Sequence, residues 1–192
     1  SNIMSRLKSI GIQVEKNDPK IKKLLDEVKD REFIGYSYDG ADASFELLAR
    51  RLMGEIPRYI IIKEYDVSVK KNNVGEIISY AKAQLEVDGQ KILCEGQGNG
   101  PVNALDNAIR KNVNKLTKYS EYLKDLKLVD YKVRILNTGT EAVTRVSIES
   151  TDSKGLNWFT IGVSPNIIEA SFKALVDSLD YKLFKDKAPA SI

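Results

Sequence analysis

The fold is decided by CEGQGNGPV, residues 94–102, which joins the end of a strand to the start of a helix. Glycine can adopt positive φ and lets another group approach the backbone closely. Pro101 suits the first helical position, where an N–H would have no partner, and we expect this helix to run to about Leu116. The N–H groups at its start form a candidate site for a small anion, although most turns of this composition are only turns.

The chain repeats itself around this turn. A shift of 66 positions places YDVSV (65–69) on YKVRI (131–135), and it also places Gly96 on Gly162. Both copies run strand, turn, strand, turn, strand, helix. Two copies of a βββα unit predict a pseudo-twofold α+β domain, because a solenoid needs at least three repeats.

Composition limits the function classes. The 192 residues include 30 Lys and Arg against 27 Asp and Glu, without the basic stripe typical of a nucleic-acid interface. We therefore do not expect nucleic acid as a partner. No apolar run has the length of a membrane span, so we do not expect a membrane partner either. The single Cys94 excludes a disulfide framework and favours a reducing, cytoplasmic location.

Residues 1–54 are expected to form a helical linker subdomain. Asp18-Pro19 is a helix-start signal, and apolar residues recur at helical spacing on both sides of a glycine-containing loop over 35–40. Asp39 or Asp42 is expected to cap the third helix, and the GEIP sequence of 54–57 to end it. The segment has too little apolar surface to fold alone, so we expect it to pack on another part of the chain, a partner or a further domain.

Residues 55–192 are expected to form a second domain, with repeats at about 58–118 and 126–186. From residue 59 the apolar period changes to 2, which indicates half-buried strands. The interpretation also includes a hairpin turn at Asp88-Gly89, a polar connection over 118–127 and a frayed tail after Lys185. The strands are expected near 65–69, 77–87, 92–95, 128–136, 142–150 and 157–163.

Catalytic chemistry has few candidate residues. The chain contains no histidine, so acid–base or metal chemistry would fall to carboxylates, lysine or tyrosine. Glu64, Asp66 and Glu149 lie on alternating strands, where a solvated sheet face explains them. Cys94 has no histidine partner and is interpreted as a small buried residue.

At this point the chain resembles the C-terminal part of the α-isopropylmalate/citramalate/homocitrate synthase family, and most of all its citramalate branch. Three stretches carry the resemblance: GYSYDGADASFELLARRL (35–52), GQGNGPVNALDNAIR (96–110) and GVSPNIIEASFKALVDSLDYKL (162–183). The first is similar to the branch's helical linker, the second to the turn of its regulatory domain, and the third to the second copy of the repeat.

The resemblance implies an allosteric regulatory fragment. Family members condense acetyl-CoA with a 2-oxo acid in a TIM barrel that holds a divalent metal, and their C-terminal domain dimerises and binds a branched-chain amino acid. The effector would be isoleucine in the citramalate branch and leucine in the isopropylmalate branch. This chain lacks the barrel and its His-x-His ligands, so the resemblance implies no catalysis and no cofactor here. The helices between the domains would move, with Tyr36 and Tyr38 as candidate hinge positions.

A free amino acid needs N–H donors for its carboxylate and a small dry pocket for its alkyl chain. The turn would supply the donors. The resemblance assigns the remaining positions to the second copy, although an alternating apolar strand is usually only core. The expected effector-binding residues are Gly98, Asn99, Gly100, Pro101, Val102, Leu128, Tyr131, Ile135, Thr140, Ala142, Thr144, Pro165 and Ile167.

Two alternatives from other classes remain open at this point. Double-stranded-RNA-binding domains share the αβββα order, but they need lysines at a helix N-terminus. Here Arg110, Lys111, Lys115 and Lys118 lie toward the other end of their helix, where cations complement the helix dipole. A domain that only dimerises is the second alternative, and in that case the glycine-rich turn would bind nothing.

Overall fold

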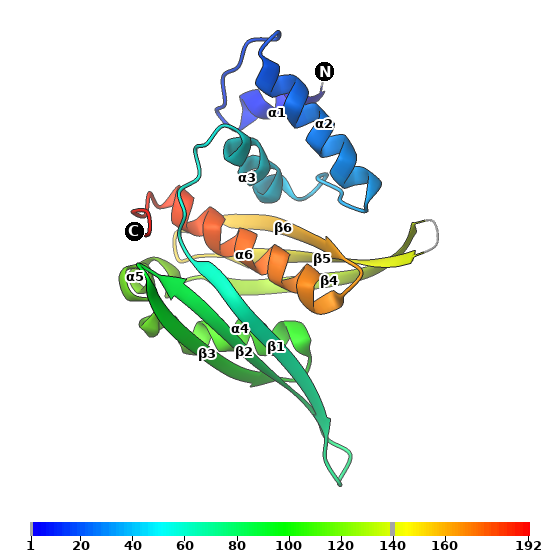
Figure 1. Ribbon diagram of the computed structural model, residues 1–192, viewed down its shortest axis with the longest axis vertical. Helices are drawn as coiled ribbons and strands as arrows, with labels where there is room; N and C mark the ends of the chain where they lie inside the picture. Colours follow the sequence, from blue (N-terminus) through cyan, green and yellow to red (C-terminus); the bar gives the residue numbers. More distant parts are fainter. Residues whose placement is uncertain (1, 139–140) are drawn as a thin grey trace. The chain divides into compact units, whose positions relative to one another are not determined.

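A computed structural model describes residues 2–138 and 141–192. The chain is α+β, with a helical segment followed by two three-stranded antiparallel sheets that each precede a helix (Figure 1), as the repeat predicted. The elements are α1 (Asn2–Ser9), α2 (Pro19–Phe33), α3 (Asp42–Leu52), β1 (Ile61–Lys71), β2 (Ile77–Val87), β3 (Gln90–Gly98), α4 (Pro101–Lys111), η1 (Val113–Lys115), η2 (Thr117–Tyr119), α5 (Ser120–Leu123), β4 (Lys127–Thr138), β5 (Glu141–Thr151), β6 (Asn157–Ser164) and α6 (Ile167–Lys185).

By packing, the chain divides into two compact units. One unit contains Ser1–Ile56, Tyr131–Ile148 and Trp158–Asp177, and the other contains Pro57–Asp130, Glu149–Asn157 and Ser178–Ile192. Each unit is described by itself below. The sequence-based division after residue 54 stays a prediction about functional parts of the chain.

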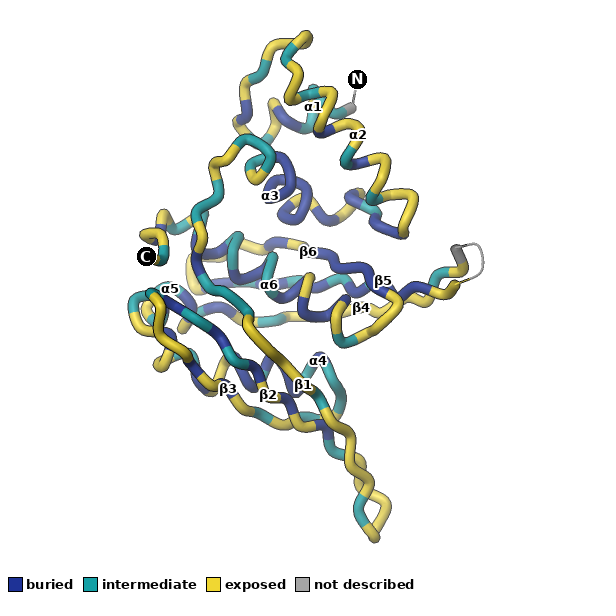
Figure 2. Tube along the Cα trace, in the orientation of Figure 1, coloured by how far each residue is buried: buried dark blue, intermediate teal, exposed yellow. Residues whose placement is uncertain are grey.

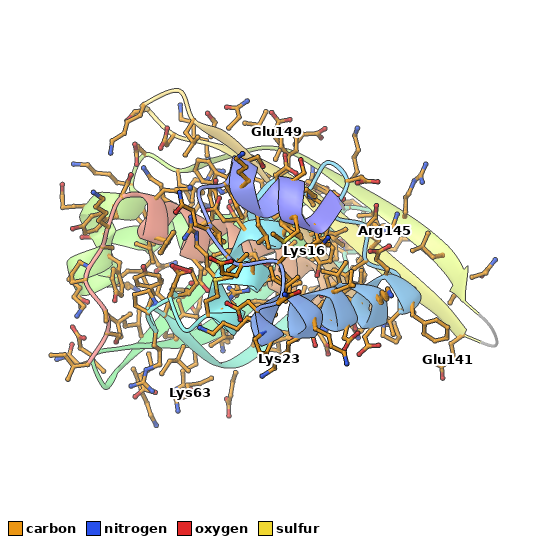
Figure 3. The ribbon with its side chains drawn as sticks, turned by 90° about the horizontal axis from the view of Figure 1, so that it is seen from above. Lys16, Lys23, Lys63, Glu141, Arg145 and Glu149 are labelled. Atoms are coloured by element: carbon orange, nitrogen blue, oxygen red, sulfur yellow. The ribbon has the colours of Figure 1, made fainter. Side chains whose placement is uncertain are left out.

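The helical segment packs on the second sheet, so another part of the chain buries its apolar surface. Val143 of β5 and Ile161 and Val163 of β6 share a core with residues from α1, α2 and α3. Figure 3 shows Arg145 of β5 beside the C-terminal end of α2, and its Nε donates to the Gly35 carbonyl at 2.8 Å. The helices therefore bury their apolar face on strands of the same unit.

The caps of these helices follow the sequence only in part. Asp18 caps α2 as predicted, because its side chain accepts from Lys20 N–H at 2.9 Å and Pro19 takes the first helical position. The expected cap of α3 by Asp39 or Asp42 is wrong. Ala41 occupies the cap position without a side-chain hydrogen bond, and Asp42 lies in the first turn, where it pairs with Arg6 at 3.0 Å.

The first sheet has the order β1-β2-β3, and α4 packs mainly over β3 and β2. The β2–β3 hairpin turns at Asp88 and Gly89, whose φ angles of 52° and 76° match the left-handed turn that Asp-Gly predicts. Along β2 every second residue from Ser79 to Val87 is buried. Figure 2 shows the buried stretch giving way to exposed residues at the far end of the β1–β2 hairpin.

Two expectations about the segment after the turn need correction. The helix after the turn ends at Lys111 and not near Leu116, because the Asn112 side chain bonds back to the Glu95 and Ala108 carbonyls. The stretch over 118–127 is not simply a polar connection, since Tyr119, Leu123 and Leu126 are buried within it.

The tail after Lys185 is not frayed. Tyr119 Oη donates to the Pro189 carbonyl at 2.7 Å, and Asp88 Oδ1 accepts from Ile192 N–H at 2.8 Å. Ser191 N–H donates to the Arg58 carbonyl at 2.7 Å. These contacts are long-range in sequence, which is why the polar composition of the tail did not predict them. In the part of the chain that the structure describes, no helix is long and apolar enough to cross a membrane.

Candidate functional site

The glycine-rich turn connects β3 to α4 as predicted, but its backbone dihedral angles differ from those of a left-handed turn. Gly100 is the N-cap of α4 with φ −169° and ψ 170°, which is extended backbone that any residue can adopt. None of Gly96, Gly98 and Gly100 has positive φ. The predicted use of glycine for a left-handed turn is therefore wrong at these positions.

Close approach of the helix explains two of the three glycines. A Cβ at Gly96 would lie 2.7 Å from Ala108 Cα, and one at Gly98 would lie 2.7 Å from the Ala104 nitrogen. A Cβ at Gly100 would meet no atom within 4 Å. The first two glycines thus let α4 lie directly on β3, whereas packing within the chain gives no reason for the third.

The turn offers fewer free donors than its sequence suggests. Asn103 Oδ1 accepts from Asn99 N–H at 3.2 Å, and Ala104 N–H donates to the Gly100 carbonyl at 2.9 Å. Within the described ranges, the N–H groups of Val102 and Asn103 have no hydrogen-bond partner. The start of α4 can therefore present two adjacent backbone N–H groups to an anion.

The predicted residues of β4 are accessible rather than packed as core. Tyr131 is 40% exposed and Ile135 is 77% exposed, while Leu128 is half-buried. Because side chains alternate along a strand, Tyr131, Val133 and Ile135 share one face of β4. An exposed apolar row of this kind suits contact with an apolar ligand or with another protein surface.

The remaining predicted residues differ in accessibility. Ala142 and Pro165 are exposed, Ile167 is 37% exposed, and Thr144 is buried. Thr140 lies outside the described residues. At the start of α6, Asn166 provides a side-chain cap, because its Oδ1 accepts from Ile168 N–H at 2.8 Å.

The predicted residues fall into two groups. Gly98 to Val102 and Leu128 belong to one compact unit, and the described residues from Tyr131 to Ile167 belong to the other. Each group is accessible in part within its own unit. The combined effector site stays a prediction.

Sequence reasoning missed a polar hollow of about 490 Å³ on the first sheet. Asp66, Lys82 and Glu95 lie directly opposite one another on β1, β2 and β3, and Lys82 Nζ is 3.6 Å from Glu95 Oε1. Alternation along the strands indicated a solvated face here, but it carries no information on whether side chains of three strands and Lys111 enclose a hollow. Ser68, Tyr80, Ala81, Gly96, Gln97 and Lys111 complete the lining.

Reactive chemistry is not favoured at the described residues. Cys94 is fully buried, and burial raises the pKa of its thiol, so the thiol is not activated as a nucleophile. No cluster of three or more histidine, cysteine or acidic side chains with metal-binding geometry occurs in residues 2–138 and 141–192. What the site residues can offer is binding, through the unpaired N–H groups of Val102 (5% exposed) and Asn103 and through exposed apolar side chains on β4.

Comparisons with known proteins match the chain to an allosteric domain. The chain belongs to the family described as the LeuA allosteric (dimerisation) domain, whose model matches residues 39–183. This assignment confirms the resemblance drawn from the linker, turn and second-copy motifs.

Among its relatives, the protein named (R)-citramalate synthase of Aquifex aeolicus is 44% identical over 97% of this chain and 35% of its own length. The (R)-citramalate synthase of Geobacter sulfurreducens is 40% identical over the same shares. The 2-isopropylmalate synthase of Clostridium acetobutylicum is 34% identical over 73% of this chain and 22% of its own length. The chain thus spans about a third of the length of the citramalate synthases that it matches.

Proposed function

We propose that this chain is the allosteric regulatory part of a citramalate synthase-type enzyme, and that it binds isoleucine as a feedback inhibitor. The parent enzyme would be an acyltransferase that joins acetyl-CoA to a 2-oxo acid, with a divalent metal in a catalytic barrel outside this chain. The regulatory part would act as a homodimer in the cytoplasm.

One observation carries the proposal. Proteins named (R)-citramalate synthase match nearly the whole chain at 40–44% identity, and the matching family model is described as allosteric. The identity to a 2-isopropylmalate synthase is lower and covers less of the chain. This difference favours isoleucine over leucine, which is the alternative effector.

The chemistry of the accessible residues supports an amino-acid ligand. The free N–H groups of Val102 and Asn103 suit a carboxylate, which gains charge-assisted hydrogen bonds at a helix start. The apolar row with Tyr131 and Ile135 suits a branched alkyl chain, because a small ligand gains affinity from apolar burial.

Inhibition would require the effector to bind one conformation of the enzyme more tightly than another. Within one unit, α3 is held on β6 and α6 by Ser44, so a shift of the second repeat would move the helical segment. Tyr36 and Tyr38 stack on each other at 5.7 Å and are buried, and they remain candidate hinge positions. Hydrogen exchange over residues 30–45 in the full enzyme, with and without isoleucine, tests this route.

Calorimetric titration of the chain with isoleucine, leucine and valine tests the proposal directly. Isoleucine is expected to bind more tightly than leucine and valine, and Gly100→Asp is expected to abolish binding by placing a carboxylate at the turn. The substitution leaves the fold intact, because the backbone at Gly100 is extended and nothing lies within 4 Å of a Cβ there. Gln90→Asp is the matched control, since it adds the same charge at the exposed opposite end of β3.

The other outcomes separate the alternatives. Preference for leucine would assign the parent enzyme to the isopropylmalate branch. No heat from any of the three amino acids, in a sample shown to be folded and dimeric, would contradict the sensor and leave dimerisation as the function. Equal loss of binding in Gly100→Asp and Gln90→Asp would remove the turn from the site.

A further inference from the structure

Two arginines lie side by side on the face of the second sheet that the helical segment partly covers. A Cβ at Gly35 would lie 3.2 Å from Val143 Cγ2 and 3.4 Å from Leu136 Cδ1, so both side chains point toward the loop after α2. The strands β4 and β5 are antiparallel neighbours, so two steps back along β4 and two steps forward along β5 run in the same direction. The next pair of side chains on this face is therefore Arg134 and Arg145.

Arg145 is held in place, yet it keeps donors free. Its Nε donates to the Gly35 carbonyl at 2.8 Å, and its side chain is half-buried beside the C-terminal end of α2 (Figure 3). Within residues 2–138 and 141–192, its two Nη atoms make no hydrogen bond and no ion pair. The guanidinium group is thus oriented by one contact, and its outer N–H groups can bind a ligand.

No acidic side chain offsets the two guanidinium groups. Burial and the charge of Arg134 lower the pKa of Arg145, and no acidic group raises it. The acids on this face of β4 and β5 are Asp130, Glu141 and Glu149, and each lies four positions from the arginine of its own strand, which is about 13 Å. Like charges side by side on neighbouring strands destabilise a sheet, so this pair is not explained by stability.

The next pair on the same face adds two further donors. Lys132 lies two positions before Arg134 on β4, and Ser147 lies two positions after Arg145 on β5. Lys132 is exposed and Ser147 is half-buried. In the described part of the chain, neither side chain has a hydrogen bond or an ion pair. Two guanidinium groups, an ammonium group and a hydroxyl group are the donors that phosphate oxygens prefer in proteins.

Helix capping explains only part of this arrangement. A cation near the end of a helix complements the helix dipole, and Arg145 contacts the Gly35 carbonyl just beyond α2. This role requires one cation. It gives no reason for Arg134, which repels Arg145, or for a half-buried Ser147 hydroxyl without a partner.

We propose that Arg134, Arg145, Lys132 and Ser147 form a binding site for a phosphate group, here called the β4–β5 phosphate site. A phosphate dianion would remove the repulsion between the two arginines, and guanidinium groups bind its oxygens through paired, charge-assisted hydrogen bonds. All four residues belong to one compact unit.

The β4–β5 phosphate site is separate from the proposed effector site. Tyr131 and Ile135 alternate with Lys132 and Arg134 along β4, so they lie on the opposite face of the strand. Phosphate binding therefore goes beyond isoleucine binding and does not depend on it. Because Arg145 also holds the Gly35 carbonyl, the site adjoins the segment with the candidate hinge residue Tyr36.

Calorimetric titration of the full 192-residue chain with inorganic phosphate, at an ionic strength held constant with sodium chloride, tests the site. Arg134→Gln and Arg145→Gln are each expected to weaken binding about tenfold or more, because each removes charge-assisted hydrogen bonds. Arg58→Gln is the matched control, since Arg58 is also exposed and lies outside the site. Arg134→Lys keeps the charge but loses the paired donors, so an intermediate affinity is expected.

Further probes define the ligand. Pyrophosphate is expected to bind more tightly than inorganic phosphate, because Lys132 and Ser147 lie about 7 Å further along the strands and can contact a second phosphate. Succinate is expected to bind more weakly than both. Tighter binding of glycerol 3-phosphate than of inorganic phosphate would identify a phosphate ester as the ligand, and the reverse order would identify the free ion. Both orders support the site.

Three outcomes would overturn the inference. These are no heat from inorganic phosphate or pyrophosphate, an equal loss of affinity in Arg134→Gln and Arg58→Gln, and tighter binding of succinate than of phosphate. Circular dichroism shows whether each variant is folded. If Arg145→Gln disturbs the Gly35 segment, the exposed Arg134 still decides the result. Failure to bind isoleucine would affect the proposed function and leave these results unchanged.

Discussion

Ser44 Oγ donates a hydrogen bond of 2.8 Å to Asp177 Oδ2, although the two residues are 133 positions apart. The same hydroxyl accepts from Ile161 N–H at 2.9 Å, and Ser44 is buried. One side chain of α3 thus contacts both the strand β6 and the helix α6. In the mechanism proposed above, Ser44 would couple movement of the helical segment to movement of β6 and α6.

Removing that hydroxyl is expected to destabilise the chain. Ser44→Ala leaves a buried N–H and a largely buried carboxylate each short of a partner, which should lower the free energy of unfolding by about 2–4 kcal/mol. Urea denaturation measures the change. Ser9→Ala is the control, because Ser9 is exposed and its Oγ bonds only locally to the Arg6 carbonyl. An equal, small effect of the two substitutions would contradict this role of Ser44.

Asp177 is expected to make stability depend on pH. Burial raises the pKa of its carboxyl above the ordinary value of 3.8, even though Arg51 and Ser44 favour the charged form. The folded state therefore binds more protons than the unfolded state just above pH 3.8, so this group's contribution to stability falls as pH rises through that window.

Asp177→Asn removes this titration and can still accept from Ser44. Its free energy of unfolding, relative to the native chain, is expected to rise between about pH 4 and the raised pKa and then level off. Urea denaturation of both proteins at several pH values measures the difference. Parallel stability curves from pH 3.5 to 7 would show that the carboxyl titrates normally.

The sequence predicted the sheet more accurately than the segments that connect it. The bounds of β2 agree with the predicted 77–87, because strict alternation and a left-handed Asp-Gly turn are local signals. The end of α4, the buried segment around Tyr119 and the ordered tail depend on contacts between distant residues. Local composition contains no information on such contacts.

The candidate site shows the same limit. Motif resemblance assigned the turn and β4 to the candidate effector site, which stays a prediction, and the reason for Gly96 and Gly98 lies in the approach of α4 and not in backbone angle. Ile135 is 77% exposed because other elements leave its part of β4 uncovered. The alternation of apolar and polar residues along the strand does not show which apolar face is covered. The polar hollow is lined by residues from three strands and by Lys111, so alternation within one strand assigned its side chains only to a solvated face.

The repeated glycines give a paired prediction. A Cβ at Gly96 would lie 2.7 Å from Ala108 Cα, and one at Gly162 would lie 2.8 Å from the nitrogen of the equivalent residue, Ala174. Gly96→Ala and Gly162→Ala should each lower the free energy of unfolding by about 1–3 kcal/mol through overpacking. Gly100→Ser is the control, because a Cβ at Gly100 meets no atom within 4 Å and serine is a good N-cap residue, so it should not lower the free energy of unfolding. Thermal and urea denaturation measure all three, and a neutral Gly96→Ala would contradict close helix–strand packing.

The ordered tail predicts a role for a buried phenol. Tyr119→Phe removes the 2.7 Å bond to the Pro189 carbonyl and should lower the free energy of unfolding by about 1 kcal/mol. Burial also raises the pKa of Tyr119 to about 12, so a spectroscopic titration should show it ionising later than an exposed tyrosine. Tyr122→Phe is the control. Unchanged stability, together with rapid proteolysis after Lys185, would mean that the tail is not held.

Lys182 gives the largest expected effect, because its Nζ is buried among three carboxylates. It lies 2.6 Å from Asp186, 2.9 Å from Asp152 and 3.4 Å from Asp125, and its side chain is 1% exposed. Lys182→Met leaves the buried Asp152 uncompensated and should lower the free energy of unfolding by about 3–5 kcal/mol at pH 7. Lys154→Met is the control, since Lys154 also pairs with Asp186 but is 68% exposed.

The pH dependence of that loss provides the decisive check on Lys182. Burial opposes ionisation of Asp152, but Lys182 and the Leu156 N–H hold its pKa below the ordinary value of 3.8. The native chain therefore loses this contribution as pH falls through the lowered pKa, whereas Asp152 in Lys182→Met has a raised pKa and regains stability when protonated. The difference in unfolding free energy between the two proteins should narrow on acidification from pH 7 to below 4. A constant difference across that range would mean that the loss comes from packing and not from charge.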